Sequence, residues 1–280
     1  MTAAPAFDFH CHSLCSDGAL SPQALIELAA ERGLQQLAIT DHDTTAAYTR
    51  QLSDQATDAQ ITLVSGCELS CLWQRRSIHV VGLNIDLTHP VFVKAMGEQA
   101  QARDRRAEKI TAVLQRMGFS LELAHIQRIA GDGVVGRPHF AEYLVRTNQM
   151  PSMAAAFKRA LGAGKPGDIK AEWPALETVV GWISAAGGVA VVAHPLKYKM
   201  TLTKLRNLLT TFVEVGGQGM EVITGHQESN QTRTLADLAQ RFELAASAGS
   251  DFHRPGQPWA ELGRASGLPE QCTPIWQLWS

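Results

Sequence analysis

The stretch Phe7-Asp8-Phe9-His10-Cys11-His12-Ser13-Leu14-Cys15-Ser16-Asp17-Gly18 carries the pattern that decides both the fold and the chemistry. Its apolar start predicts a strand, and side chains along a strand alternate between two faces. His10 and His12 are therefore expected on one face and Cys11 on the other. Neutral imidazole binds zinc, manganese and iron, so this strand end predicts half of a metal site, to which the next loop adds Asp17. Taken alone, a His-x-His pair is equally consistent with two surface histidines.

Similar residues recur beside other apolar runs, which favours the metal site. Each group follows or opens a run that predicts a strand: Asp41, His42 and Asp43 after 37–40, Glu68 after 61–64, His79 before 80–83, His194 after 189–192, and Asp251 and His253 after 244–250. Six of the ten histidines occupy such positions. Chance would scatter histidines through loops and helices, so this clustering indicates one site assembled from many strands.

Strands and helices are expected to alternate along most of the chain. Counting the first, seven strands are predicted, the others at about 36–40, 61–66, 78–85, 189–192, 219–223 and 244–248. Residues 71–76 are predicted to form a turn or hairpin tip before the strand at 78–85. Helices are predicted from Pro22 to about Gly33 and over 44–57, 202–213 and 229–241. Repeated βα units predict an α/β fold with a parallel sheet closed into a barrel. Because the carboxyl ends of barrel strands converge on one face, the candidate ligands should meet there.

Residues 89–171 interrupt this alternation and read as helices only, over about 90–117, 121–130, 138–147 and 152–162. We therefore predict a discontinuous barrel domain, 1–88 and 172–280, with 89–171 as a helical insertion covering the site. Residues 98–170 contain 12 Lys and Arg against seven Asp and Glu, whereas the rest of the chain contains 13 and 20. A basic segment over a carboxylate-rich site suits a phosphorylated substrate.

Composition and local motifs narrow the class of protein. The 280 residues carry a net charge of −2, which argues against a general polyanion binder. No stretch resembles a secretory signal or a membrane span, so the cytoplasm is the expected compartment.

Two C-x3-C pairs, Cys11/Cys15 and Cys67/Cys71, could suggest a thiolate zinc site. Strand alternation instead turns Cys11 and Cys67 away from the metal side, as buried, reduced thiols. The G-x-G-x-x-G sequence at 131–136 follows a helical pattern, so a dinucleotide-binding loop is not expected.

The predicted ligand set is too large for one ion. It consists of His10, His12, Asp17, His42, Glu68, His79, His194, Asp251 and His253. Nine nitrogen and oxygen ligands fit two or three divalent ions, and the two oxygens of Glu68 suit a bridge. Because no thiolate takes part, the donor set is consistent with manganese, zinc or iron. Manganese is the first expectation, with zinc and iron as alternatives. Asp41 and Asp43 could orient a ligand histidine, or could be ordinary turn carboxylates.

Together these motifs resemble those of the PHP (polymerase and histidinol phosphatase) family. The resemblance spans essentially the whole chain and implies a distorted (β/α)7 barrel whose multinuclear metal centre hydrolyses phosphate esters. It also implies a metal-bridging hydroxide, held at Glu68, Asp251 and His194, that attacks phosphorus. The insertion and the sequence Gly136-Arg137-Pro138-His139 are most similar to the subgroup that contains 3′,5′-nucleotide bisphosphate phosphatase and the 5′→3′ exoribonuclease RNase AM.

The expected reaction is removal of the 3′-phosphate from 3′,5′-bisphosphonucleotides such as pAp, trimming of short 5′-phosphorylated RNA from its 5′ end, or both. Candidate substrate contacts are Arg137, His139, Arg103, Lys197 and His226. No duplex DNA, membrane or obligatory protein partner is expected. Histidinol-phosphate phosphatase is the alternative activity, and a non-catalytic metal-bound PHP module is the alternative of another class.

Overall fold

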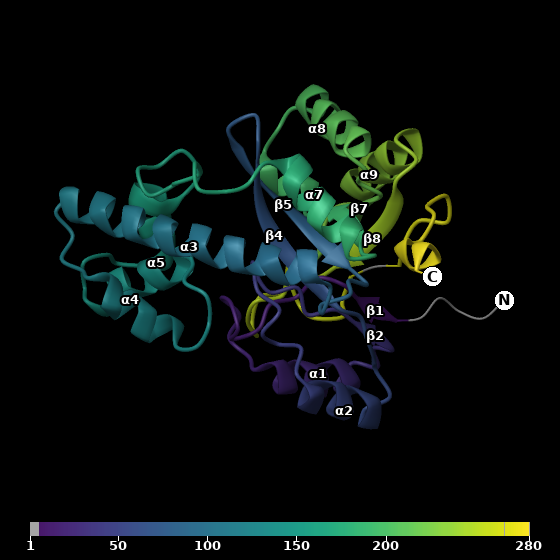
Figure 1. The fold of residues 1–280 in the computed structure, drawn as a ribbon, viewed down its shortest axis with the longest axis horizontal. Helices are drawn as coiled ribbons and strands as arrows, with labels where there is room; N and C mark the ends of the chain where they lie inside the picture. Colours follow the sequence, from purple (N-terminus) through teal and green to yellow (C-terminus); the bar gives the residue numbers. More distant parts are fainter. Residues whose placement is uncertain (1–5, 266, 280) are drawn as a thin grey trace.

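The chain forms two β-sheets, one with three parallel strands and one with five strands that include a hairpin. The computed structural model describes residues 6–265 and 267–279. A three-stranded parallel sheet contains β1 (Phe7–Asp8), β2 (Gln36–Leu37) and β3 (Thr62–Leu63). A five-stranded sheet contains β4 (Gly66–Trp73), β5 (Arg76–Leu83), β6 (Val189–Val192), β7 (Gly219–Thr224) and β8 (Ala245–Gly249), in that spatial order (Figure 1).

Backbone contacts close these two sheets into a ring. Phe9 N donates to Ala248 O at 3.2 Å, which joins β1 to β8. On the other side, His42 and Glu68 form a parallel bridge. β3 and β4 are separated by two residues only, 64 and 65, and so occupy one strand position. The ring therefore has seven strand positions, which confirms the predicted distorted α/β barrel.

The expectation of an all-parallel sheet is wrong at β5, which runs antiparallel to both β4 and β6. β4 and β5 are joined by two residues, Gln74 and Arg75, with φ of 45° and 64°. A two-residue connection of this kind can join only antiparallel strands. The hairpin changes the source of two candidate ligands, because Glu68 and His79 lie within strands and not after their carboxyl ends.

Helices cover the outside of the ring. They are α1 (Pro22–Glu31), α2 (Arg50–Asp58), α7 (Leu176–Ala185), α8 (Leu202–Glu214) and α9 (Ser229–Arg241). Ser21 caps α1 as expected, since its side chain accepts from Ala24 N. α2 begins six residues later than predicted, at the Thr49 cap. α7 was not predicted, although its buried positions recur at helical spacing (Leu176, Val179, Val180 and Ile183).

The inserted segment is helical throughout. It contains α3 (Pro90–Arg116), α4 (Leu123–Ala130), α5 (Arg137–Arg146), α6 (Met153–Ala156) and a π-helical turn (Phe157–Leu161). These elements share a separate apolar core that includes Ile110, Leu114 and Phe140. The first half of α3 packs against the barrel, because Phe92 is buried in the barrel's largest core cluster. One continuous helix thus joins the two cores (Figure 1).

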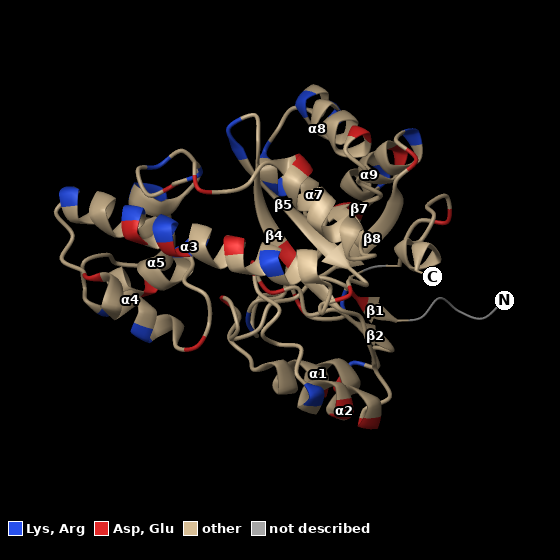
Figure 2. Cartoon of the chain, in the orientation of Figure 1, with Lys and Arg blue, Asp and Glu red and all other residues tan. Residues whose placement is uncertain are grey.

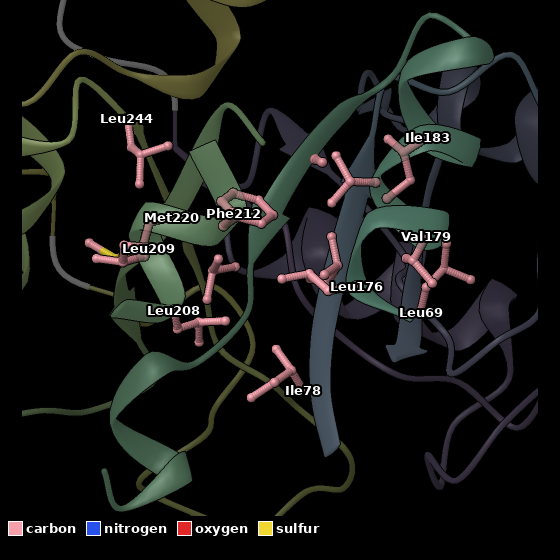
Figure 3. Packing of buried hydrophobic residues seen from close by; sticks show 14 of the residues in the cluster. Leu69, Ile78, Leu176, Val179, Ile183, Leu208, Leu209, Phe212, Met220 and Leu244 are labelled. Carbon is pink, nitrogen blue, oxygen red and sulfur yellow. The ribbon is translucent and has the colours of Figure 1, made fainter. Parts of the chain in front are cut away.

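The largest core cluster packs α7, α8 and α9 against the five-stranded sheet. In Figure 3, Val179 of α7 lies beside Leu69 of β4, and Phe212 of α8 lies in the same part of the cluster as Met220 of β7. Cys11 and Cys67 are fully buried in two different apolar clusters, which agrees with their predicted orientation. Among the described residues, no helix has the length and hydropathy required to cross a bilayer.

Candidate metal centre

Glu68 lies at the middle of the candidate ligands. Its carboxylate oxygens lie 2.8 Å from His194 Nε2, 2.9 Å from His79 Nδ1 and 3.0 Å from His42 Nδ1. The Nε2 atoms of His10 and His12 are each 3.3 Å from Oε2. Five histidines from four segments therefore converge on one carboxylate that is itself fully buried.

Two further carboxylates complete the cluster. Asp251 Oδ1 lies 3.3 Å from His12 and 3.6 Å from His253. Asp17 Oδ1 lies 3.4 Å from His253 Nε2, and its Oδ2 lies 3.9 Å from His42. The structure thus brings together all nine residues predicted from sequence.

The cluster divides into overlapping groups. In three of them the donor atoms all lie within 4.8 Å of one another: His12, Asp17, His42 and His253; His10, His12 and Glu68; and His42, Glu68 and His79. Each group could hold one ion, and the shared members could bridge neighbouring ions. Nitrogen and carboxylate donors without a thiolate fit manganese, zinc or iron.

Unpaired buried atoms show that this donor set fits divalent ions. Within the described part of the chain, His12 Nδ1, His42 Nδ1, His194 Nδ1 and Glu68 Oε2 are buried and have no hydrogen-bond partner of acceptable geometry. Leaving a polar atom buried and unpaired costs about 1–3 kcal/mol. Cation coordination would satisfy these atoms, which are of the kind that bind such ions.

The charges of the cluster suit cations. Burial alone would raise the pKa of Glu68, but attraction from His42 and His79 outweighs it and holds the pKa well below the ordinary value. The same balance lowers the pKa of Asp17 beside His253 and that of Asp251 beside His10. The three carboxylates are therefore ionised at neutral pH.

Strained backbone accompanies these ligands. His194, Asp251 and Asp43 adopt positive φ, at 28°, 53° and 53°. Such conformations are uncommon for residues other than glycine and cluster where function requires a fixed geometry. Two of these residues, His194 and Asp251, are candidate ligands, and the third, Asp43, directly follows the candidate ligand His42.

Asp41 and Asp43 stabilise the segments that carry the candidate ligands. Asp41 accepts hydrogen bonds from Ser13 N at 2.7 Å and from Ser16 Oγ at 2.5 Å, which fixes the loop that presents Asp17. Asp43 accepts from Ser70 N at 2.6 Å on the far side of Glu68. Neither residue hydrogen-bonds a ligand histidine among the described contacts, so they orient backbone segments and not imidazole rings.

Two further carboxylates were missed in the sequence. Glu221, in β7, lies 2.5 Å from His10 Nδ1 and accepts from His194 N, also at 2.5 Å. Asp8, within β1, accepts from Ser250 N and from Gly263 N, which anchors the loop carrying Asp251. Each is one acidic residue inside an apolar strand run, and that mismatch was the signal available in the sequence.

An arginine-lined pocket of about 120 Å³ adjoins the cluster. Three candidate ligands border it, namely Asp17, His42 and His79, and the insertion supplies Arg103, Arg106 and Arg137. The guanidinium groups of Arg103 and Arg106 lie 5.5 and 5.0 Å from the centre of the Trp173 ring. Burial, then repulsion from Arg137 and Arg103, lowers the pKa of Arg106. Asp43 and Asp168 pair with Arg103 and Arg137, but three guanidinium groups crowded into one pocket still make it suited to an anion.

The predicted substrate contacts have different surroundings. Arg137 lines the pocket and also donates to Leu161 O at 3.0 Å and to Asp168 at 3.2 Å. Arg103 lines it while pairing with Asp43. His139 is outside the pocket lining, because its Nδ1 accepts from Gly136 N and caps α5.

Lys197 and His226 lie elsewhere. Lys197 forms an ion pair with Asp251, and both Lys197 and His226 line a second cavity beside His194. Arg106, which the set of predicted contacts omitted, belongs to the arginine pocket. Along the exposed side of α3, basic and acidic residues are intermixed, so the anion site is local and not a general basic surface (Figure 2).

A closed α/β ring carrying nine converging histidine and carboxylate side chains defines a metal-dependent hydrolase. The chain belongs to the PHP family, since residues 8–159 match the family model described as the PHP domain. It is 41% identical to the 5′-3′ exoribonuclease Rnm of Escherichia coli, over 98% of this chain and 93% of the relative. It is 38% identical to the 3′,5′-nucleoside bisphosphate phosphatase of Chromobacterium violaceum, over 96% and 95%.

Solved structures support the same assignment. A Chromobacterium violaceum protein described as an amidohydrolase, with bound sulfate and no metal, has a TM-score of 0.88 and 37% identity, covering 97% of this chain and 95% of that one. A Bifidobacterium adolescentis protein described as a metal-dependent phosphoesterase has a TM-score of 0.80 and 28% identity, covering 97% and 93%.

Proposed function

We propose that this chain removes the 3′-phosphate from 3′,5′-bisphosphonucleotides and trims short 5′-phosphorylated RNA from its 5′ end. The arrangement that carries the proposal is an arginine pocket directly beside a multi-ligand metal centre. A substrate with two phosphates can place one at each position. The names of the two relatives, an exoribonuclease and a bisphosphate phosphatase, describe substrates of this kind.

The metal assignment is part of the proposal. The nine clustered residues would hold two or three divalent ions, with manganese as the first choice and zinc or iron as alternatives. When bound, such ions would acidify a water molecule and stabilise charge on the phosphoryl oxygens. In this proposal, Glu68, Asp251 and His194 would hold that water molecule.

The chain's own residues would position the substrate. Arg137 and Arg106 would bind the phosphate that does not react, through the planar donor geometry that matches phosphate oxygens. That binding energy would orient the reacting phosphate. The insertion, residues 89–171, would act as a lid that excludes water from this pocket. The sulfate bound by the Chromobacterium violaceum relative resembles phosphate in shape and charge.

The alternatives account for less of the structure. Histidinol phosphate has one phosphate and would leave the arginine pocket unused. A non-catalytic module would not require nine converging ligands with four unpaired buried donor atoms. Hydrolysis of 3′,5′-bisphosphonucleotides and RNA would use both the metal centre and the arginine pocket.

Product release from a small substrate panel tests the proposal. The purified, manganese-loaded chain should release phosphate from pAp and 5′-mononucleotides from a 5′-phosphorylated oligoadenylate, and act weakly on histidinol phosphate. Asp251→Asn, which keeps the size of the side chain, should abolish both reactions. Preferential hydrolysis of histidinol phosphate would overturn the assignment.

A further inference from the structure

A second cavity borders the metal centre at a different position from the arginine pocket. It has a volume of about 190 Å³ and lies between the turn after β6 and helix α9. His194 lines this cavity and also belongs to the metal centre, since its Nε2 is 2.8 Å from Glu68. The arginine pocket is bordered by His42 and His79 instead, and the two cavities have no lining residue in common.

The lining of this second cavity suits a nucleoside. Pro195, Leu196 and Leu235 provide apolar surface, and Thr224, Gln227 and Gln231 provide polar edges. The amide nitrogen of Gln227 donates hydrogen bonds to Val222 O and to the Thr232 hydroxyl. The amide nitrogen of Gln231 makes no hydrogen bond in the described part of the chain. The ammonium group of Lys197, paired with Asp251, places positive charge where the cavity meets the metal centre.

An exposed indole lies on the segment that contacts the rim of this cavity. Trp259 is 60% exposed, the highest value among the large apolar side chains described. Its carbonyl accepts a hydrogen bond from His226 N at 2.8 Å, and His226 lines the cavity. Exposed aromatic side chains near a nucleotide site are the groups on which unpaired RNA bases stack.

We propose that this cavity, together with Trp259, binds the nucleotide immediately 3′ of the phosphate being cleaved in RNA. The inference rests on the proposed function and specifies its polymeric substrate. In the reaction a water oxygen bonds to phosphorus, the P–O3′ bond breaks, and the electron pair remains on O3′, which gains a proton. The products are a 5′-mononucleotide with a free 3′-hydroxyl and a shorter chain that keeps the attacked phosphate on its 5′ oxygen.

This balance explains why two cavities are needed. The 5′-phosphate of the first nucleotide occupies the arginine pocket, and the second nucleotide, attached to the attacked phosphorus, extends toward His194 and the second cavity. The new 5′-phosphate is the group that the arginine pocket binds in the next cycle. With pAp no second nucleotide exists, so the second cavity contributes nothing.

The test compares two substrates in the manganese-loaded full chain. Trp259→Ala should lower the ratio of kcat/KM for pApApA to kcat/KM for pAp by about 5- to 100-fold, the range expected for losing one base stack. Trp259→Phe should retain most of the ratio, since it keeps an aromatic face. Leu202→Ala, which truncates an exposed apolar residue on α8, is the matched control and should leave the ratio unchanged.

Gln231→Glu provides an independent variant, because an acidic side chain in the first turn of an exposed helix does not endanger folding. It should lower the same ratio by charge repulsion. A second measurement is the Kd for a trinucleotide, determined by fluorescence anisotropy. The first linkage of this trinucleotide carries a methylene group in place of O3′, so the chain cannot cleave it. Trp259→Ala should weaken its Kd by a similar factor.

The outcomes separate this inference from the proposed function. If Trp259→Ala and Gln231→Glu leave the ratio and the Kd unchanged, or lower both substrates equally, the downstream site is wrong. If the unmodified chain cleaves pAp but not pApApA, the downstream site is again wrong while the phosphatase activity stands. If it cleaves neither, the proposed function itself fails.

Discussion

Arg103 Nε donates to Asp43 Oδ2 at 2.7 Å, and this buried pair joins the inserted helix α3 to the loop that carries His42. The same guanidinium donates to Val135 O at 3.0 Å, just before α5. Asp43 also accepts from Gln99 and Ser70. A single cluster of polar contacts therefore fixes the metal side and the arginine pocket relative to each other.

Breaking this pair should destabilise the fold. Arg103→Met or Asp43→Ala leaves one charge buried without its partner, which costs about 3–5 kcal/mol in the free energy of unfolding. The double variant should lose less than the sum of the two. Arg105→Ala, on the same helix but half exposed, is the control and should change stability by about 1 kcal/mol or less. Denaturant unfolding measures all four; additive losses would show that the pair is not coupled.

Glu221→Gln should weaken metal binding. The Glu221 carboxylate lies 2.5 Å from His10 Nδ1 and so fixes which nitrogen of His10 faces the cluster. Loss of such a partner typically costs about 10- to 100-fold in metal affinity. Metal titration followed by calorimetry measures the change directly. Glu214→Gln, an exposed position on α8, should have no effect, and an unchanged affinity in Glu221→Gln would contradict the role.

Metal removal should lower thermal stability as well as activity. At an ion concentration about 1,000 times Kd, binding adds about 4.1 kcal/mol, which corresponds to a Tm shift of about 8–16 °C for a chain of this size. Melting curves before and after chelation, and after adding back manganese, zinc or iron, test this expectation. Elemental analysis should find more than one ion per chain. An unchanged Tm after verified removal would show that the cluster binds no ion of consequence.

Arg137→Ala should discriminate between one and two phosphates. A lost hydrogen bond to a charged group costs about 2–3 kcal/mol, so kcat/KM for pAp should fall by roughly 30- to 150-fold. Arg106→Gln should act in the same direction, because Arg106 lines the same pocket. Hydrolysis of 3′-AMP should change little in either variant, since it has no second phosphate. Equal losses on both substrates would mean that these arginines only support the fold.

Alternation and helical periodicity predicted most of the barrel. The helix expected at 229–241 is α9, and the one expected at 90–117 is α3 to within a residue. The turn or hairpin tip predicted at 71–76 is confirmed by the two-residue connection at Gln74 and Arg75. The antiparallel direction of β5 was missed because the alternation of strands and helices in the rest of the barrel predicted a parallel sheet. α7 was missed although its pattern is present, because it lies between the predicted insertion and the strand expected at 189–192.

The candidate ligands were predictable because histidine and carboxylate are conspicuous beside apolar strand runs. Their supporting residues were harder to identify. Glu221 and Asp8 act through backbone and imidazole contacts made across more than 200 positions of sequence. Arg103, Arg106 and Arg137 are equivalent in sequence. Only tertiary packing determines that Arg103 pairs with Asp43, that Arg137 pairs with Asp168 and that Arg106 donates to Ile169 O.

The continuity of α3 limits how this molecule can move. Its first half is buried with Phe92 in the barrel core and its second half with Ile110 and Leu114 in the core of the insertion. Gly133, in the loop before α5, also lies so close to Leu14 O that an added Cβ would be 2.4 Å away. A hinge between the two parts would have to break a helix and separate this contact. The distance between the metal centre and the arginine pocket is therefore set by the fold itself, and under the proposed function it would select substrates whose two phosphates match that spacing.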